Sequence, residues 1–285
     1  MAAKFGPAGA DYRFAEEGHK SSLEMCEWLS NMGLDAYEYQ CNRGVKISEE
    51  TARKLGETAR QFGIALSIHA QYYINLATPE PEKREKSINY MLETLTAADW
   101  MGATKIVVHS GAAAKIDRRV ALENAKATLL EAQRRADGLG LGHIRICPET
   151  MGKINQLGDL DEVMALCGLD ERFLPTIDFG HLHTRGMGCL NTADDFKAVL
   201  DVMENRIGSE RAKNFHSHFS RIEFTKGGEK RHHTYADTQY GPDFGPLAKL
   251  ICERNLSPTI ICESAGTQAR DAKIMKNIYE KERCL

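Results

Sequence analysis

The chain has 285 residues, of which 27% are charged and 42% hydrophobic, and its formal net charge is −3. This is the profile of a globular protein that can bury a large core, and the charge balance alone gives no reason to expect a nucleic-acid partner. The sequence has no run of 18 apolar residues, so we expect no membrane span, and its first residues lack the apolar core of a signal peptide.

Short apolar runs alternate with longer amphipathic stretches along the chain. We expect eight strands, at residues 4–9, 36–40, 65–70, 105–110, 143–149, 174–181, 214–220 and 259–264. The segments between them predict helices at 21–32, 49–62, 82–101, 118–139, 160–166, 193–207, 244–254 and 268–282. Eight such units predict a (β/α)8 TIM barrel, an α/β fold that forms a single domain over residues 1–285. An open doubly wound sheet is the alternative, but no G-x-G-x-x-G turn follows the first strand.

The eight cysteines include no C-x-x-C pair. Buried free thiols in a reducing compartment explain them better than a disulfide framework does. We therefore expect a cytoplasmic protein, and we take a monomer as the starting hypothesis.

Ionisable side chains lie in or directly after six consecutive predicted strands, from the third to the eighth, and two more follow the seventh. These candidate metal ligands are His69, His109, Glu149, Asp178, His181, His216, Glu229, His232 and Glu263. In a TIM barrel, the carboxyl ends of the strands form the functional face. Carboxylates and imidazoles that converge there are costly to desolvate unless cations bind. The donors suit Zn²⁺, with Mn²⁺ or Fe²⁺ as alternatives, and their number indicates two or three ions, a centre suited to phosphate esters.

Three motifs resemble the endonuclease IV family of AP endonucleases. Residues 69–75 (HAQYYIN) are close to that family's H-x-x-Y-x-I-N signature. Residues 147–150 (CPET) and 261–264 (ICES) resemble its fifth-strand and eighth-strand motifs. The resemblance spans nearly the whole chain, because the candidate ligands recur in the same order on matching strands.

The resemblance implies a trinuclear zinc site that cleaves the DNA phosphodiester 5′ to an abasic sugar. It implies that the first zinc is bound by His69 and His109, and that Glu149 bridges the first and second. The second zinc would also be bound by Asp178, His216 and Glu263, and the third by His181 and His232. We expect Glu149 and Glu263 to be the carboxylates on which catalysis depends.

The chain departs from the family pattern at several positions. Lys230 stands where the family usually has an aspartate ligand, and Glu229 beside it is either a replacement ligand or a solvated loop charge. The family's H-x-N-D-S after the seventh strand corresponds here to residues 216–220 (HSHFS). The first strand ends without the histidine that the family tends to place there. These departures indicate a divergent branch.

Three residues are candidates for DNA contacts. Tyr72 is either a wedge beside the lesion or an ordinary loop residue, and Arg43 is either a phosphate anchor or part of a solvated turn. Arg185 precedes two glycines that would allow close approach to a phosphate.

The favoured hypothesis is a zinc-dependent AP endonuclease that acts on DNA containing abasic sites. A metal-dependent sugar isomerase or epimerase on the same barrel is the main alternative, and an inactive DNA-binding relative is another. The negative net charge does not exclude DNA, because bound cations would offset the four carboxylates among the nine candidate ligands.

Overall fold

The eight predicted strands form one parallel sheet in the structure, a computed structural model that describes residues 2–113 and 116–284. The strands lie in the order β1-β10-β7-β6-β5-β4-β3-β2. Their bounds are β1 Lys4–Pro7, β2 Ala36–Gln40, β3 Ala65–His69, β4 Lys105–His109, β5 Arg145–Glu149, β6 Thr176–Asp178, β7 His216–Phe219 and β10 Thr259–Cys262. A parallel bridge between Ala8, just after β1, and Glu38 in β2 joins the two edge strands, so the sheet curls into a barrel.

Closure of the barrel depends on a close approach between β1 and β2. A Cβ atom at Gly6 would lie only 1.7 Å from the carbonyl oxygen of Ala36. Glycine alone lets the two backbones come this close, so the sequence needs it in the first strand.

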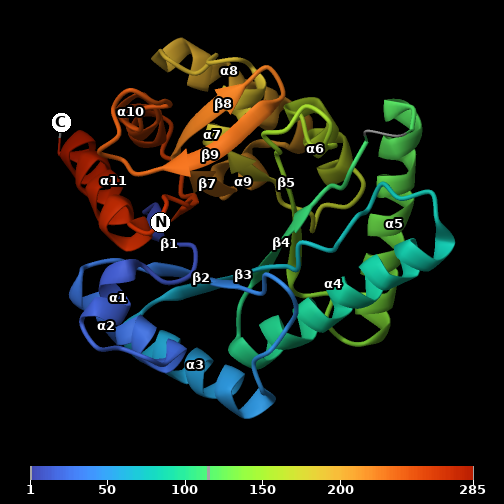
Figure 1. Ribbon diagram of the computed structural model, residues 1–285, viewed down its shortest axis with the longest axis horizontal. Helices are drawn as coiled ribbons and strands as arrows, with labels where there is room; N and C mark the ends of the chain where they lie inside the picture. The colour runs from blue at the N-terminus through green and yellow to red at the C-terminus, as the bar shows by residue number, and fades with distance from the viewer. Residues whose placement is uncertain (1, 114–115, 285) are drawn as a thin grey trace.

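Helices surround the strands, and α11 packs on the N-terminal strand β1 (Figure 1). They are α1 Tyr12–Glu16, η1 Ser22–Glu24, α2 Met25–Asn31, α3 Glu49–Phe62, α4 Pro81–Met101, α5 Arg118–Gly138, α6 Leu160–Cys167, α7 Phe179–Arg185, α8 Ala193–Ile207, α9 Ser209–Lys213, α10 Gly245–Glu253 and α11 Gln268–Arg283. Local sequence explains several starts: the Ser48 hydroxyl accepts the Thr51 N–H at α3, and Thr192 with Asp195 forms a capping box at α8. The (β/α)8 barrel predicted from the sequence is confirmed.

The sixth strand is shorter than predicted. It ends at Asp178, and the predicted strand residues 179–181 belong to α7 instead. The Asp178 carboxylate accepts the backbone N–H of His181 at 2.7 Å, which caps the new helix, and the backbone N–H of Asp178 donates to the Thr150 hydroxyl. This cap turns the chain directly from strand to helix and sets His181 on the first helical turn.

The seventh unit carries an antiparallel hairpin that the sequence analysis did not predict. Strands β8 (Arg221–Thr225) and β9 (Gly228–His233) pair with each other outside the barrel sheet. The hairpin brings Glu229 and His232 back over the carboxyl ends of the barrel strands.

The barrel strands are buried on both faces. Ile68, Ile106, Ile146 and Ile177 are fully buried between the barrel and its helices. Among the described residues, none of the helices combines the length and the apolar character needed to cross a bilayer.

Candidate metal centre

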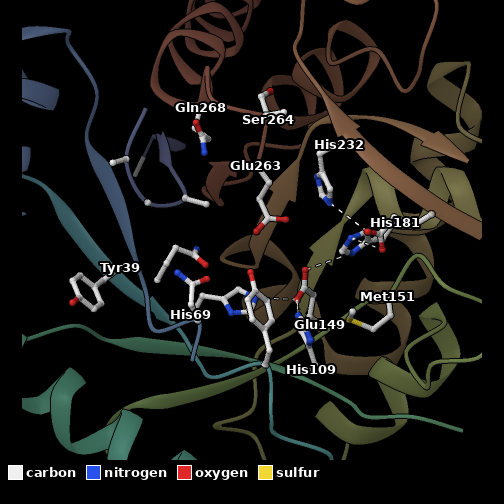
Figure 2. Close-up of a pocket in the computed structure, with 18 of the residues that line it drawn as sticks. Tyr39, His69, His109, Glu149, Met151, His181, His232, Glu263, Ser264 and Gln268 are labelled. Carbon is white, nitrogen blue, oxygen red and sulfur yellow. Dashed lines mark ion pairs between the residues drawn. The ribbon is translucent and has the colours of Figure 1, made fainter. Parts of the chain in front are cut away.

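The carboxyl ends of the strands open into a cavity of about 830 Å³. His69, His109 and Glu149 end β3, β4 and β5, and Glu263 directly follows β10. The side chains of His69, Glu149, His181, His232 and Glu263 point toward one another in this cavity (Figure 2). Seven of the nine predicted ligands line it: His69, His109, Glu149, His181, Glu229, His232 and Glu263.

The first group of candidate ligands is formed by His69, His109 and Glu149. Their nearest donor atoms all lie within 4.8 Å of one another. The Oε2 atom of Glu149 is 3.5 Å from Nε2 of His69 and 3.3 Å from Nε2 of His109. Two imidazoles and a carboxylate are suited to one zinc ion, with a fourth position left open.

A second group adjoins the first and shares Glu149 with it. It contains Glu149, Asp178, Glu263 and His218, again within 4.8 Å of one another. The Nδ1 atom of His218 lies 2.9 Å from Oε1 of Glu149 and 3.5 Å from Oε1 of Glu263. Asp178 and His218 lie directly below the cavity surface and are fully buried.

The third group contains His181, His232 and Glu263. Glu229 lies between the two imidazoles, with its carboxylate 3.5 Å from Nε2 of His181 and 3.7 Å from Nε2 of His232. A Cβ atom at Gly152 would lie 2.6 Å from the Cβ of Glu229, so this glycine lets the hairpin approach the barrel. Glu229 therefore occupies the cavity rather than the position of a solvated loop charge.

His216 lies apart from Asp178 and Glu263, although with Glu38 and His218 it forms a further group of possible metal ligands. The Nε2 atom of His216 lies 2.8 Å from Oε2 of Glu38, deep in the barrel, and His218 takes the place predicted for His216 beside Asp178 and Glu263. Side chains two apart on a strand share a face, so both histidines point inward. The strand register decides between them, because His218 pairs with Asp178 whereas His216 pairs with Thr176.

The buried charges change one another's pKa values. Burial alone would lower the pKa of His69 and His181, but neighbouring carboxylates raise both to about 9. Burial alone would raise the pKa of Glu149, but His218, His109 and His69 hold it well below its usual value. Burial raises the pKa of Asp178. The centre therefore attracts positive charge, whether protons or metal cations.

The residues fit a set of metal ions. Among the described residues, the buried atoms Oε2 of Glu149 and Oδ2 of Asp178 accept no hydrogen bond. Such atoms are costly to bury without a partner, and a cation would supply one. The other ring nitrogens of three histidines are already engaged: Nδ1 of His69 with the Ala70 carbonyl, Nδ1 of His181 with the Thr150 carbonyl, and Nδ1 of His232 with the Ser220 hydroxyl. Their Nε2 atoms consequently face the cavity.

The predicted DNA contacts have different outcomes. Tyr72 lies at the cavity, is 55% exposed, and holds its ring 5.7 Å from that of His109. Arg43 is exposed in the turn after β2, beside Asn42, which lines the cavity.

Arg185 is placed elsewhere than predicted. Its guanidinium donates to the backbone carbonyls of Met151, Lys153 and Gln156, at 2.9–3.2 Å. A half-buried guanidinium needs acceptors for its five donors, and the loop after β5 supplies them. Arg185 thus holds this loop and does not present its charge to the cavity.

Sequence reasoning missed three residues near the centre. Lys153 is the one lysine or arginine among the described residues that line the cavity, and within the described chain its ammonium forms no ion pair. Its position in the loop after the fifth strand was the available signal. His218 was recognised in the seventh strand but not chosen as a ligand, and Glu38 was not noticed, because the sequence alone does not assign the inward face of either strand.

Comparison with known proteins agrees with this architecture. The model of the family described as xylose isomerase-like TIM barrel matches residues 26–279. An uncharacterized protein of Methanocaldococcus jannaschii is 32% identical over 277 residues, which are 97% of this chain and 97% of the relative. A probable endonuclease 4 of Acholeplasma laidlawii is 27% identical over 234 residues, which are 76% of this chain and 78% of the relative.

Solved structures share the fold, and two of them bear on the function. Endonuclease IV from Thermus thermophilus matches with a TM-score of 0.69 at 21% identity, over 99% of this chain and all of its own. A D-tagatose 3-epimerase-like protein matches with a TM-score of 0.72 at 19% identity, over 98% of this chain and 96% of its own. The resemblance to endonuclease IV predicted from the sequence is confirmed at the level of family and fold, and the chain belongs to the xylose isomerase-like TIM barrel family.

Proposed function

We propose that this protein is a metal-dependent phosphodiesterase of the endonuclease IV type that cleaves DNA 5′ to abasic sites. One observation carries the proposal: three of the four groups of possible ligands adjoin one another, with Glu149 shared by the first and second and Glu263 by the second and third; the fourth, Glu38 with His216 and His218, shares His218 with the second. Shared carboxylates keep neighbouring cations close together, as phosphate ester hydrolysis requires. The similarity to a probable endonuclease 4 supports this assignment.

In this proposal the ligands are those predicted from the sequence, with His218 in place of His216 in the second group. Zinc, or manganese or iron(II), would supply a nucleophile at neutral pH and stabilise charge on the phosphate. Glu149 and Glu263, each shared by two groups, would hold neighbouring cations close together so that one phosphate could bind to both. The ammonium of Lys153 is free to pair with a phosphate oxygen, and Tyr72 at the cavity mouth offers a ring against which a nucleotide stacks.

A sugar epimerase is the second candidate function. It is favoured by the similarity to a D-tagatose 3-epimerase-like structure and by amide and hydroxyl groups on the cavity wall, from Gln40, Asn42, Ser264 and Gln268. Epimerisation would use Glu149 and Glu263 to move protons beside a metal-polarised carbonyl. The first and third groups, each with two histidines, have no evident role in that chemistry. A third possibility is a relative that binds DNA without turnover.

The test is incision of a duplex with one abasic site, after loading the protein with zinc or manganese. We expect cleavage 5′ to the abasic sugar and none of an otherwise identical intact duplex. Glu263→Gln serves as the control for contaminating nucleases. Incision at the level of that variant would refute the proposal, and turnover of a ketose in parallel assays would favour the epimerase.

A further inference from the structure

A carboxylate that no sequence motif pointed to lies beneath the proposed metal centre. Glu38 is on β2, and its side chain is fully buried in the barrel. The Ser67 hydroxyl donates to its Oε2 at 2.8 Å, and Nε2 of His216 lies 2.8 Å from the same oxygen. Burying a carboxylate is expensive even when it is hydrogen-bonded, so its neighbours indicate what it does.

The other oxygen of Glu38 faces a candidate metal ligand. Its Oε1 lies 2.9 Å from Nε2 of His218, whose Nδ1 is 2.9 Å from Oε1 of Glu149. The His218 ring is thus placed between two carboxylates, one below it and one in the centre. Hydrogen bonds reach Glu38 from Ser67 and His216 on Oε2 and from Gln40 on Oε1 at 3.4 Å. With Nδ1 as the metal donor, the ring proton of His218 stands on Nε2 and faces Oε1 of Glu38.

This arrangement differs from that of the other candidate histidines. In His69 and His181 the Nδ1 atom, which faces away from the cavity, contacts a backbone carbonyl, and in His232 it contacts a hydroxyl. His218 has a carboxylate behind it, on Nε2. A carboxylate behind a ligating imidazole fixes its tautomer and raises its basicity more than a neutral group does.

We propose that Glu38 is a positioning residue that holds His218 with Nδ1 toward Asp178 and Glu263, and thereby strengthens the metal site of the second group. The inference rests on the proposed metal centre. His216 and Ser67 hold Glu38 in turn, which gives His216 a role that its distance from the centre otherwise leaves unexplained. The two histidines of β7 and the glutamate of β2 form one unit.

The test is the affinity for each metal of the full-length Glu38→Gln variant, by chelator competition with Zn²⁺ and by the absorption spectrum of bound Co²⁺. We expect one metal to bind about 10–100-fold more weakly, the other metals to keep their affinity within about threefold, and the Co²⁺ spectrum to change. Asp35→Asn is the matched control, because Asp35 lies on the chain just before β2 and pairs with Lys276 at the opposite end of the barrel. It should leave all affinities unchanged.

Ser67→Ala tests the same unit in case Glu38→Gln does not fold. It removes one hydrogen bond from Glu38 and keeps the charge, so we expect a loss of about 2–5-fold for the same metal. Wild-type affinities in both variants would overturn the proposal, as would an equal loss at every site. Because metal binding is measured without DNA, a chain that binds metals in this graded way but does not incise abasic DNA would refute the proposed function alone.

Discussion

The proposed metal centre is held in two different ways. On the barrel side, His69, Glu149, Asp178 and His218 come from strands of the closed sheet and are at most 4% exposed. On the hairpin side, the side chains of Glu229 and His232 are 15% and 24% exposed, and their strands pair only with each other in the sheets described. The ligands on the barrel side therefore belong to the buried core, whereas Glu229 and His232 belong to a hairpin added outside the barrel sheet.

The hairpin packs on α7 through its first strand, where Ile222 is fully buried against Gly180, and its tip meets the loop after β5. The backbone N–H of Glu229 donates to the Gly152 carbonyl at 3.2 Å, and that of Ile154 donates to the Gly227 carbonyl. Substitution of the partly exposed Glu229 or His232 should therefore remove a metal at little cost in stability, whereas substitutions of the buried ligands in the barrel affect metals and fold together.

The largest effect is expected at the shared carboxylate of the barrel side. Glu149→Gln removes a ligand from two groups, so we expect loss of two metals and a fall in incision rate of about a thousandfold or more. The measurements are metal content and single-turnover incision of an abasic duplex. A variant that keeps a tenth of the activity would show that Glu149 does not bridge the groups.

Substituting each of the two histidines of β7 tests which of them is a ligand of the second group. His218→Ala should lose the metal of the second group and slow incision by about a hundredfold, whereas His216→Ala should keep that metal with an affinity lowered about tenfold. Metal titration of both variants gives the comparison. The reverse ranking would restore His216 as the ligand.

His232→Ala tests the hairpin side. We expect loss of one metal and a decrease in incision of about a hundredfold, with a Tm within about 2 °C of the wild type, because the side chain is outside the core. Calorimetry beside metal analysis decides the outcome. A large drop in Tm would mean that the hairpin is part of the cooperative unit.

The smallest effects on activity are expected for Arg185, which holds a loop, and for Lys153, which has no ion-pair partner among the described residues. Arg185→Ala should destabilise the fold by about 1–3 kcal/mol, because carbonyls of the loop after β5 lose their donor. Lys153→Ala should leave stability unchanged and reduce the salt dependence of DNA binding by about one charge. Binding isotherms at several salt concentrations distinguish the two. A reduced salt dependence in Arg185→Ala alone would return Arg185 to the DNA interface.

The apolar runs were enough to predict the barrel, because parallel strands buried on both faces consist of such runs. The end of each run then marks the carboxyl end of its strand. For His69, His109 and Glu149, the strand end coincides with the end of the apolar run, and the structure brings the three together. His216 and His218 share an inward face, so the register with β6 was needed to choose between them. The position of the Arg185 guanidinium could not be predicted from the sequence, because the carbonyls of Met151, Lys153 and Gln156 that it binds belong to another loop.

The most direct test of the metal centre is an anomalous-scattering map of the protein loaded with zinc. We expect three peaks: one between His69 and His109, one beside Asp178 and His218, and one between His181 and His232. A single peak beside Asp178 and Glu263, with the flanking histidines empty, would contradict it and favour an epimerase.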